Sequence, residues 1–542
     1  MRIEKLNKDG SFSSLIQDYS DISRDNGGQG IFREDVSLQK GWYHILVKAV
    51  NSTGATVAIN DLKAGVGNVF IIAGQSNAQG IKDGVLLPTD NAYDCVVSNN
   101  WLGECSWVTS PAPAYVPYPL FPVFSRLGNG NNIAPNGYNN WAYSRLGNLQ
   151  VDATSAPIAF FNAAHGSTDI NAWKTSSDGG AVTGMPFIGH PCSILSVPNN
   201  SGLPYIRLKQ SLNYYASMFG SRGVLWHQGE AETEHKFGNP SYNSDYVNKL
   251  NYVIAKSRAQ YGYNIPWFVS RDATLISKKN DATGVWTYGI TEPTIKSNQN
   301  TVATTSPNLT GAITDGLNKD YRKPNDFVHL NDNATYKGLT SLANSWHSSL
   351  GSTGSGYAAQ SLPAITMSYN SSNDSYTAYA PSGYVDYKWV TANGDLDRGV
   401  GSGSSGSSLL MGGAGVRCWV KNSTGNWMVT PMVYPQTCRS GARKAALESS
   451  ETVPLEIVYG LRVFPNPSVG SIRVQFDLPK AGQVQLNIIT QNGERLKKVA
   501  DGYHDKGPFT YPIDVSSLQD GIYFCQLKIG DISLVKKIVV AK

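Results

Sequence analysis

The sequence predicts an α/β protein built on a doubly wound parallel sheet with helices on both faces, followed by two small all-β domains. Strand and helix periods alternate between about residues 66 and 350. A five-residue apolar strand, 69–73, precedes a sharp Gly-Gln-Ser-Asn turn, which would place Ser76 at the carboxyl end of the sheet, where ligands and catalytic groups collect. Beyond residue 362 the helical period disappears, and short alternating segments predict β structure.

Length and composition limit the class of protein. The 542 residues exceed what a single core holds, so two to four domains are expected. Only 16% of the residues are charged, while Gly and Tyr are frequent, which suits loop-rich β structure outside the cell. The net charge of +5, with no Lys/Arg cluster, argues against a nucleic-acid partner. No apolar run approaches the roughly 18 residues of a transmembrane helix.

No metal or other cofactor is expected. The six cysteines include no C-x-x-C pair, which argues against a zinc or redox motif. Cys95 and Cys105 could form a disulfide in an oxidising compartment, and unpaired buried thiols are the alternative. The acidic run 230–235, together with His227, contains possible metal ligands, but such runs are more often solvated loops.

Residues 1–65 are expected to form a β segment. Residues 36–50 alternate around a Gly turn, and residues 55–61 can pair beside them. Two or three strands bury too little apolar surface to be stable alone. The segment should therefore pack on the next domain or be part of a sandwich.

The α/β domain is expected at 66–350. Residues 82–138, rich in Pro, Gly and aromatic residues, are predicted to be surface loops covering the site. Buried strands are predicted at 69–73, 157–164, 223–226, 266–270 and 311–314, and helical spacing at 208–219, 247–254 and 339–350.

Composition divides the rest of the chain. The Gly/Ser-rich residues 351–361 are typical of a flexible linker. Residues 362–438 resemble an immunoglobulin-like β-sandwich in their short alternating segments, although the usual upstream cysteine is missing. A polar spacer at 439–456 leads to a last β unit at 457–542.

Polar residues at the predicted strand ends can supply the groups that ester hydrolysis by a serine needs: a nucleophile, a base, a residue that orients the base, and donors to the oxyanion. Ser76 can be the nucleophile. Asp326 and His329 are close enough in sequence for the carboxylate to accept the Nδ1 proton while Nε2 faces Ser76. The alternatives are structural: a capping serine in an ordinary strand-to-helix turn, and a capped turn at a helix start.

Three further residues follow strand ends. Gly166 could offer a backbone N–H to an oxyanion, and Gln228 could offer its side-chain amide. Glu230 is predicted to orient the site by hydrogen bonding, with an exposed turn carboxylate as the alternative. Asp169 and Trp173 are interpreted as loop packing rather than sugar contacts.

The order of these blocks resembles the SGNH hydrolase superfamily over about residues 66–350. Gly-Gln-Ser-Asn at 74–77 together with Gln-Gly-Glu at 228–230 is similar to the sialate O-acetylesterase and acetyl-xylan-esterase branch of carbohydrate esterases. The resemblance implies a three-layer, flavodoxin-like α/β fold. Two departures, Ala78 where Met is frequent and His165-Gly166-Ser167 in place of Gly-Gly-Thr, leave the acyl group and the substrate open.

The resemblance also implies roles for individual residues. Ser76 would be the nucleophile, His329 the base and Asp326 the residue that orients it. The backbone N–H groups of Ser76 and Gly166 and the Gln228 side chain would form the oxyanion hole. The supporting residues would be Gln75, Asn77 and Glu230.

The C-terminal unit resembles the sorting domain of the type IX secretion system of Bacteroidetes. The resemblance rests on segments at 463–467, 491–493, 518–523 and 534–540. It implies export through the periplasm, removal of the domain, and release or attachment at the cell surface; a generic β accessory domain is the alternative. Because the residues after Met1 lack an apolar signal segment, we hypothesise that Met1 is not the biological start.

Together these features predict a secreted carbohydrate esterase that removes acetyl groups through an acyl-enzyme. Aromatic residues in the loops between 82 and 140 would shape a sugar site, because aromatic rings bury apolar area against pyranose faces. One alternative is a lipase-like general esterase of the same superfamily, which would hydrolyse longer acyl chains. The other is a non-catalytic glycan-binding adhesin. The glycan, whether sialic acid, xylan or another, is left open.

Overall fold

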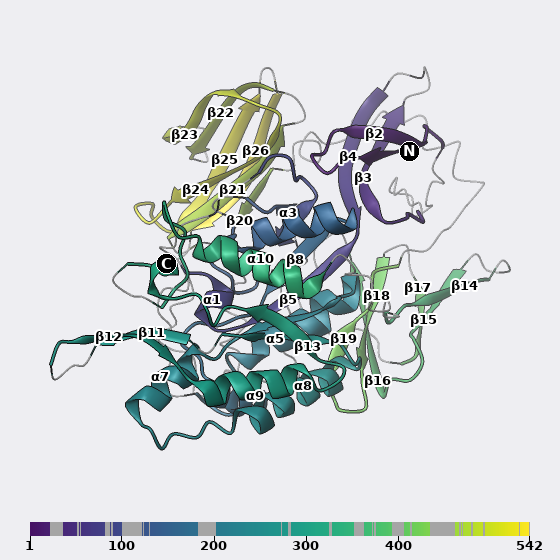
Figure 1. The fold of residues 1–542 in the computed structure, drawn as a ribbon. Coiled ribbons are helices and arrows are strands. Elements are labelled where there is room, and N and C mark those ends of the chain that lie inside the picture. The colour runs from purple at the N-terminus through teal and green to yellow at the C-terminus, as the bar shows by residue number, and fades with distance from the viewer. Residues whose placement is uncertain are drawn as a thin grey trace. The chain divides into compact units, whose positions relative to one another are not determined.

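The computed structural model divides into two compact units. One comprises Ile3–His44 and Lys63–Arg439, and the other Met1–Arg2, Ile45–Leu62 and Ser440–Lys542. The chain is coloured along its length in Figure 1. The structure describes residues 1–21, 36–50, 54, 56–81, 87, 90–99, 122, 124–128, 131–182, 202–272, 274–279, 283–324, 328–351, 362–370, 372, 375–392, 406–411, 415–433, 461–464, 468, 470–478, 481–490, 494–529 and 532–540.

A seven-stranded sheet forms the centre of the first unit, in the order β13-β10-β9-β5-β8-β6-β7. Its pairs are parallel except at one edge, where β7 runs antiparallel to β6. The predicted parallel α/β sheet is thus confirmed for six strands. The strands are β5 (Asn68–Gly74), β6 (Val96–Asn99), β7 (Phe124–Arg126), β8 (Ile158–Asn162), β9 (Gly223–His227), β10 (Trp267–Arg271) and β13 (Leu309–Ile313).

Strands β6 and β7, at one end of the sheet, correct the prediction of loops throughout residues 82–138. β6 has only four residues, and two of them, Ser98 and Asn99, are buried polar side chains. Neither β6 nor β7 has an apolar run long enough to signal a strand, so pairing with β8 and with each other forms them. Most of the aromatic-rich part of this segment, including 100–121, lies outside the described residues.

Helices cover both faces of the sheet, as Figure 1 shows. Successive residues of β5 face opposite sides: Ile71 joins one apolar cluster, while Phe70 and Ile72 join the other. On the side of Phe70 lie α3 (Tyr143–Thr154) and α10 (Gly338–Leu350). The helices on the side of Ile71 are α4 (Ile170–Ser177), α5 (Tyr205–Gln210), the π-helical segment η1 (Ser211–Ala216), α6 (Ser217–Phe219), α8 (Tyr246–Tyr261) and α9 (Pro293–Ala303).

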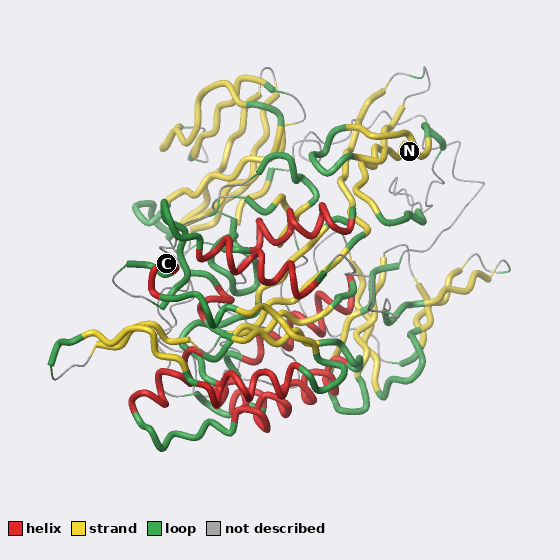
Figure 2. Tube along the Cα trace, in the orientation of Figure 1, coloured by secondary structure: helices red, strands yellow, loops and turns green. Residues whose placement is uncertain are grey.

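Figure 2 shows that the described elements after α10 are all strands, as the loss of helical period predicted. Two three-stranded antiparallel sheets lie within 362–438, in the orders β14-β15-β17 and β16-β18-β19. Of the predicted linker, 351–361, residues 352–361 lie outside the described residues. The strands are β14 (Thr366–Asn370), β15 (Ser375–Tyr379), β16 (Asp386–Ala392), β17 (Ser408–Met411), β18 (Gly415–Lys421) and β19 (Trp427–Val429).

These sheets share an apolar core with the helical layer that contains η1. The Trp419 ring stacks on Tyr214 with ring centroids 6.0 Å apart. Asn213 Nδ2 donates to the Trp427 carbonyl oxygen (3.2 Å), and Asn422 Nδ2 to that of Gln260 (2.9 Å). Buried side chains from both parts belong to one cluster, so this module is packed on the α/β domain.

The C-terminal residues form a three-stranded sheet, β20-β21-β24, and a four-stranded sheet, β23-β22-β25-β26. The alternating apolar residues of β21 and β22 meet in one cluster, as their spacing predicted. The strands are β20 (Arg462–Phe464), β21 (Ser471–Leu478), β22 (Gly482–Ile489), β23 (Arg495–His504), β24 (Gly507–Asp514), β25 (Gly521–Ile529) and β26 (Ile532–Val540).

Two smaller groups of strands complete the description. The N-terminal segment forms a four-stranded sheet, which agrees with the β structure predicted there, and residues 274–279 pair with residues 286–291 in an unpredicted antiparallel ribbon. Cys95 is a buried free thiol, while Cys105 lies outside the described residues. The strands are β1 (Arg2–Leu6), β2 (Phe12–Gln17), β3 (Gly41–Val50), β4 (Thr56–Val66), β11 (Thr274–Lys279) and β12 (Trp286–Thr291).

Within the part of the chain that the structure describes, none of the helices combines the length and the hydrophobicity that a membrane span requires.

Candidate active site

Ser76 lies at the turn that ends β5, and it opens the short helix α1 (Ser76–Gln79). The turn is pressed against the end of β9. Gly74 has a φ of +129°, and a Cβ there would lie 2.0 Å from the His227 carbonyl oxygen, so only glycine fits. The Gln75 N–H donates to the same oxygen (3.0 Å). Between residues 71 and 80, Ser76 alone is not buried.

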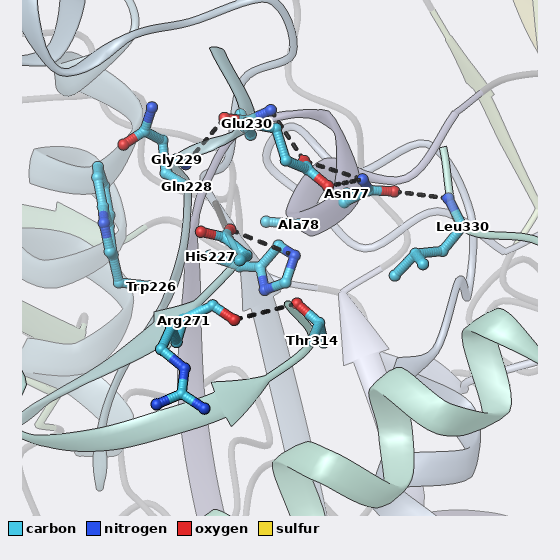
Figure 3. Close-up of polar contacts among 12 residues, drawn as sticks. Asn77, Ala78, Trp226, His227, Gln228, Gly229, Glu230, Arg271, Thr314 and Leu330 are labelled. Atoms are coloured by element: carbon cyan, nitrogen blue, oxygen red, sulfur yellow. Dashed lines mark hydrogen bonds and ion pairs between the residues drawn. The ribbon is translucent and has the colours of Figure 1, made fainter. Parts of the chain in front are cut away.

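The Glu230 carboxylate is the centre of a buried polar network beside Ser76. It accepts hydrogen bonds from Gln75 Nε2 (3.0 Å) and Asn77 Nδ2 (2.9 Å), the two residues that flank Ser76. Its Oε1 also pairs with the Arg322 guanidinium at 2.6 Å, and both side chains are buried. Figure 3 shows Glu230 and Asn77 pointing toward one another. Glu230 is therefore not an exposed turn carboxylate.

The same network holds the segment that carries His329. Asn77 Nδ2 donates to the Val328 carbonyl oxygen (3.1 Å), and Asn77 Oδ1 accepts from the Leu330 N–H (2.9 Å), a contact visible in Figure 3. Arg322 also donates to the Val328 carbonyl oxygen. The residues on either side of His329 are thus bound to the residue that follows Ser76. Asp326 lies outside the described residues.

Gly166 lies directly against Ser76. A Cβ at Gly166 would lie 3.4 Å from Ser76 Cβ and 3.1 Å from Gln79 Oε1, so glycine permits the close approach. The Gly166 N–H donates to Gln79 Oε1 (2.7 Å), and Gln79 Nε2 donates to the Asn136 carbonyl oxygen (2.9 Å). An oxyanion at Gly166 would therefore take the place of the Gln79 oxygen. The sequence carried no signal for Gln79, because a residue one helical turn after the serine reads as ordinary helix.

The Gln228 amide, which was predicted as an oxyanion donor, is engaged inside the protein. Its side-chain N–H2 donates to the Thr168 carbonyl oxygen (3.3 Å) and to Glu232, so both hydrogens are used inside the protein. In Figure 3 the Gln228 side chain points away from Asn77. The amide was expected to face the site because it follows a strand end, but the buried carboxylate of Glu232 attracts it to the other side.

The structure corrects the prediction of a solvated loop for the acidic run after β9. This run is the helix α7 (Glu230–Gly238) and not a solvated loop, and Glu230 and Glu232 are buried while Glu234 is exposed. In a helix the side chains at 230 and 232 point about 200° apart, so a single buried face was not expected to hold both carboxylates, and charge alone did not reveal their burial.

His227, Glu230 and Asp272 could bring three ligand atoms within 4.8 Å of one another. His227 Nε2 lies 3.4 Å from Asp272 Oδ2. The Glu230 oxygens, however, already bind Arg322, Asn77 and Gln75, and the guanidinium would repel a cation. Burial lowers the pKa of His227 to about 3 and raises that of Asp272 well above its usual range, so burial favours the neutral form of both side chains.

The residues after Gly166 pack the loop, as predicted. Asp169 caps α4 by accepting the Ala172 N–H (2.7 Å). Trp173 is fully buried, and its Nε1 donates to Thr168 Oγ1 (3.0 Å). The structure thus places neither side chain as a sugar contact.

Two family models match the chain, and one of them covers the α/β domain with its serine turn at the carboxyl edge of the sheet. Residues 66–347 match the family described as carbohydrate esterase, sialic acid-specific acetylesterase, which makes the chain a carboxylic ester hydrolase that acts on carbohydrate. Residues 462–541 match the secretion system C-terminal sorting domain, which indicates export by the type IX system to the cell surface or beyond. Since the first match spans just over half of the 542 residues, the chain belongs to this carbohydrate esterase family.

Solved structures give weaker likenesses. A carbohydrate acetylesterase from Xanthomonas citri is 14% identical, with 74% of this chain and 94% of that chain covered and a TM-score of 0.35. A protein of Arabidopsis thaliana is 17% identical over 52% of this chain and 98% of that chain, with a TM-score of 0.29. TM-scores this low do not establish a shared fold. A comparison with curated proteins finds no match.

The buried Glu230–Arg322 pair leads to a stability prediction. Replacing Arg322 with methionine would leave the Glu230 carboxylate buried without its cation, which should lower the free energy of unfolding by about 3–5 kcal/mol in chemical denaturation. Adding Glu230→Gln to this variant removes the unpaired buried charge and should recover part of the lost free energy of unfolding. The exposed Lys498–Asp501 pair is the control, and Lys498→Met should cost at most about 1 kcal/mol. If Arg322→Met and Lys498→Met lowered the free energy of unfolding by the same amount, the prediction would be contradicted.

Glu232 leads to a prediction about pH. Burial, reinforced by the charge of Asp169, raises the pKa of Glu232 from 4.5 to about 7. A raised folded-state pKa means that the native state binds the proton more tightly than the unfolded chain does. Protonated Glu232 then contributes on the order of 3 kcal/mol to the free energy of unfolding. This contribution is fully present below about pH 4.5 and is lost as the pH rises through about 7. Unfolding measured at several pH values should show this fall, and Glu232→Gln should lack it; a Glu232→Gln protein with the wild-type pH dependence would assign the fall to other groups.

Proposed function

We propose that the protein removes O-acetyl groups from a carbohydrate through a Ser76–His329–Asp326 triad. Ser76 Oγ attacks the acetyl carbonyl while His329 takes the hydroxyl proton, and the sugar alkoxide leaves with a proton from His329. Water, deprotonated by His329, then attacks the acetyl-serine and releases acetate. Asp326 would accept the other imidazole proton and stabilise the imidazolium.

The observation that carries this proposal is the double hydrogen bond of Asn77 to the segment of His329. Asn77 binds the backbone of Val328 and of Leu330, and it directly follows Ser76. Two segments about 250 residues apart in sequence are thereby held side by side, as a nucleophile and its base require.

Exposure separates the reacting residues from the supporting ones. Ser76, Gly166 and His329 are partly exposed, while the supporting Gln75, Asn77 and Glu230 are buried. A substrate can reach the first group, and the second group holds its backbone. This division favours a working site over a structural turn, and it argues against the adhesin alternative.

For the oxyanion we retain the N–H groups of Ser76 and Gly166. The close contact between Gly166 and Ser76 supports this pair, provided that the oxyanion replaces the Gln79 oxygen on the Gly166 N–H. Gln228 is not retained, because both hydrogens of its amide bind groups away from Ser76. Two backbone donors aimed at the developing charge are the usual minimum for acyl transfer.

The test is acetate release by the full chain from acetylated sialic acid, acetylated xylan and other acetylated glycans, beside aryl esters of increasing acyl length. Acetate release from one glycan class is expected, and it would name the substrate. Cleavage of longer esters without acetate release would favour the lipase-like alternative. A folded protein that cleaves none of these esters would contradict the proposed reaction and leave the adhesin.

A further inference from the structure

Glu232 joins two segments of the candidate site. Its side chain is fully buried in α7, two residues after Glu230. Oε1 accepts the Ile170 N–H (2.5 Å), and Oε2 accepts a hydrogen of the Gln228 amide, whose other hydrogen goes to the Thr168 carbonyl oxygen (3.3 Å). One carboxylate therefore connects the end of β9 to the segment after Gly166, both directly and through Gln228.

The connected segment is the Gly166 loop, defined here as residues 163–169 between β8 and α4. Within it, Thr168 Oγ1 donates to the His165 carbonyl oxygen (2.6 Å) and accepts from Trp173 Nε1 (3.0 Å). Thr168 is thus tied on one side to the residue before Gly166 and on the other to α4. A shift of Thr168 or Ile170 would carry Gly166 with it.

We propose that Glu232 is a positioning residue for ester hydrolysis: its carboxylate, acting through Ile170 and Gln228, keeps the Gly166 N–H in place beside Ser76. The inference rests on the proposed function and adds a residue outside the triad and the oxyanion hole. The geometry requires two acceptors, because both oxygens face an N–H donor. A protonated carboxyl or an amide supplies one acceptor and one donor, so one N–H would face another donor.

The surroundings of Glu232 make its charge dependent on pH near neutrality. The titratable groups that interact with it are themselves acids, namely Asp169, Tyr242, Tyr246 and Asp272. Asp169 in turn lies 3.5 Å from the ring of His235, which is half exposed. The two-acceptor form should therefore be complete only above about pH 7.

The decisive comparison is Glu232→Gln against Glu234→Gln. Gln at 232 keeps the size but not the second acceptor, while Glu234 is an exposed residue of the same helix. For a small acetyl ester, Glu232→Gln should lower kcat by about 10- to 100-fold with KM changed by less than about twofold, since a small displacement of a catalytic donor is costly. Glu234→Gln should match the wild type.

The pH profile separates positioning from general damage to the fold. In the wild type Glu232 must lose a proton for full activity, so it should add about one to the limiting slope of log kcat on the acid side. Glu232→Gln should lose this added slope. Glu232→Asp, which keeps both acceptor oxygens, should keep the added slope and recover part of kcat. A Glu232→Gln enzyme with wild-type kcat, or with low kcat but an unchanged slope, would overturn the proposal while leaving the Ser76 mechanism standing.

Hydrogen exchange tests the positioning role apart from catalysis. The Gly166 and Ile170 amides should exchange at least about tenfold faster in Glu232→Gln than in the wild type or in Glu234→Gln, because one acceptor of the loop is lost. Unchanged exchange at both amides would overturn the inference, even if the wild type proved to release no acyl group from any ester.

Discussion

Replacing Ser76 with alanine should lower acetate release from the preferred glycan by at least about a thousandfold, because no other group would form the acyl-enzyme. The fold should be unaffected, since Ser76 is the partly exposed residue of its turn and the hydrogen bonds of Gln75 and Asn77 with Glu230 do not involve its side chain. Initial rates at saturating substrate, with circular dichroism to check folding, measure both effects.

The matched control for this prediction is Ser348→Ala, on the exposed side of α10, which should retain wild-type rates. His329→Ala should approach the loss of Ser76→Ala, and the double variant should lose no more than either single one, because nucleophile and base act as a unit. A Ser76→Ala enzyme with more than about a tenth of wild-type activity would refute the serine mechanism.

Removing the module at 362–438 should abolish folding of the α/β domain. Its strands contribute Trp389, Trp419, Met428 and Val429 to the same buried cluster as the helices of the sheet's Ile71 side. Ending the chain at residue 351 would expose Tyr214 and its neighbours to water, at about 25 cal/mol for each Å² of apolar surface. Such a fragment should be insoluble or lack a cooperative unfolding transition.

A point substitution tests the same interface within the full chain. Trp419→Ala should lower the free energy of unfolding by about 3–5 kcal/mol, because it leaves a cavity beside Tyr214. Tyr379, which is 43% exposed in the same module, is the control, and Tyr379→Ala should cost about 1 kcal/mol or less. A fragment 66–350 that unfolds cooperatively with native activity would show instead that the module is dispensable.

The sequence predicts where Gln228 lies in the fold but not the direction of its side-chain amide. The position of Gln228 after β9 was read correctly, since a buried apolar strand ends there. The direction of its amide depends on Glu232 and on Thr168, which lies about 60 residues earlier in the chain. Hydrogen-bond direction is set by partners that only the fold brings together.

The interpretation of residues 82–138 shows a second limit. A strand as short as β6 has little apolar pattern of its own, so its local propensity is overridden by the strands that it pairs with. The same holds for the module at 362–438: its alternating residues predicted strands, but not that Trp419 of β18 would stack on Tyr214 of η1.

The sequence by itself determined the central strands, the helices around them, the serine at the carboxyl edge of the sheet and the two families, because each follows from local periodicity or a short ordered motif. Only the tertiary structure decided which carboxylates are buried, that Asn77 binds both sides of His329, and that Gln228 turns toward Glu232. Burial and hydrogen-bond pairing are long-range properties: a polar side chain has its partners chosen by the whole fold, whereas an apolar strand is recognised from its own residues.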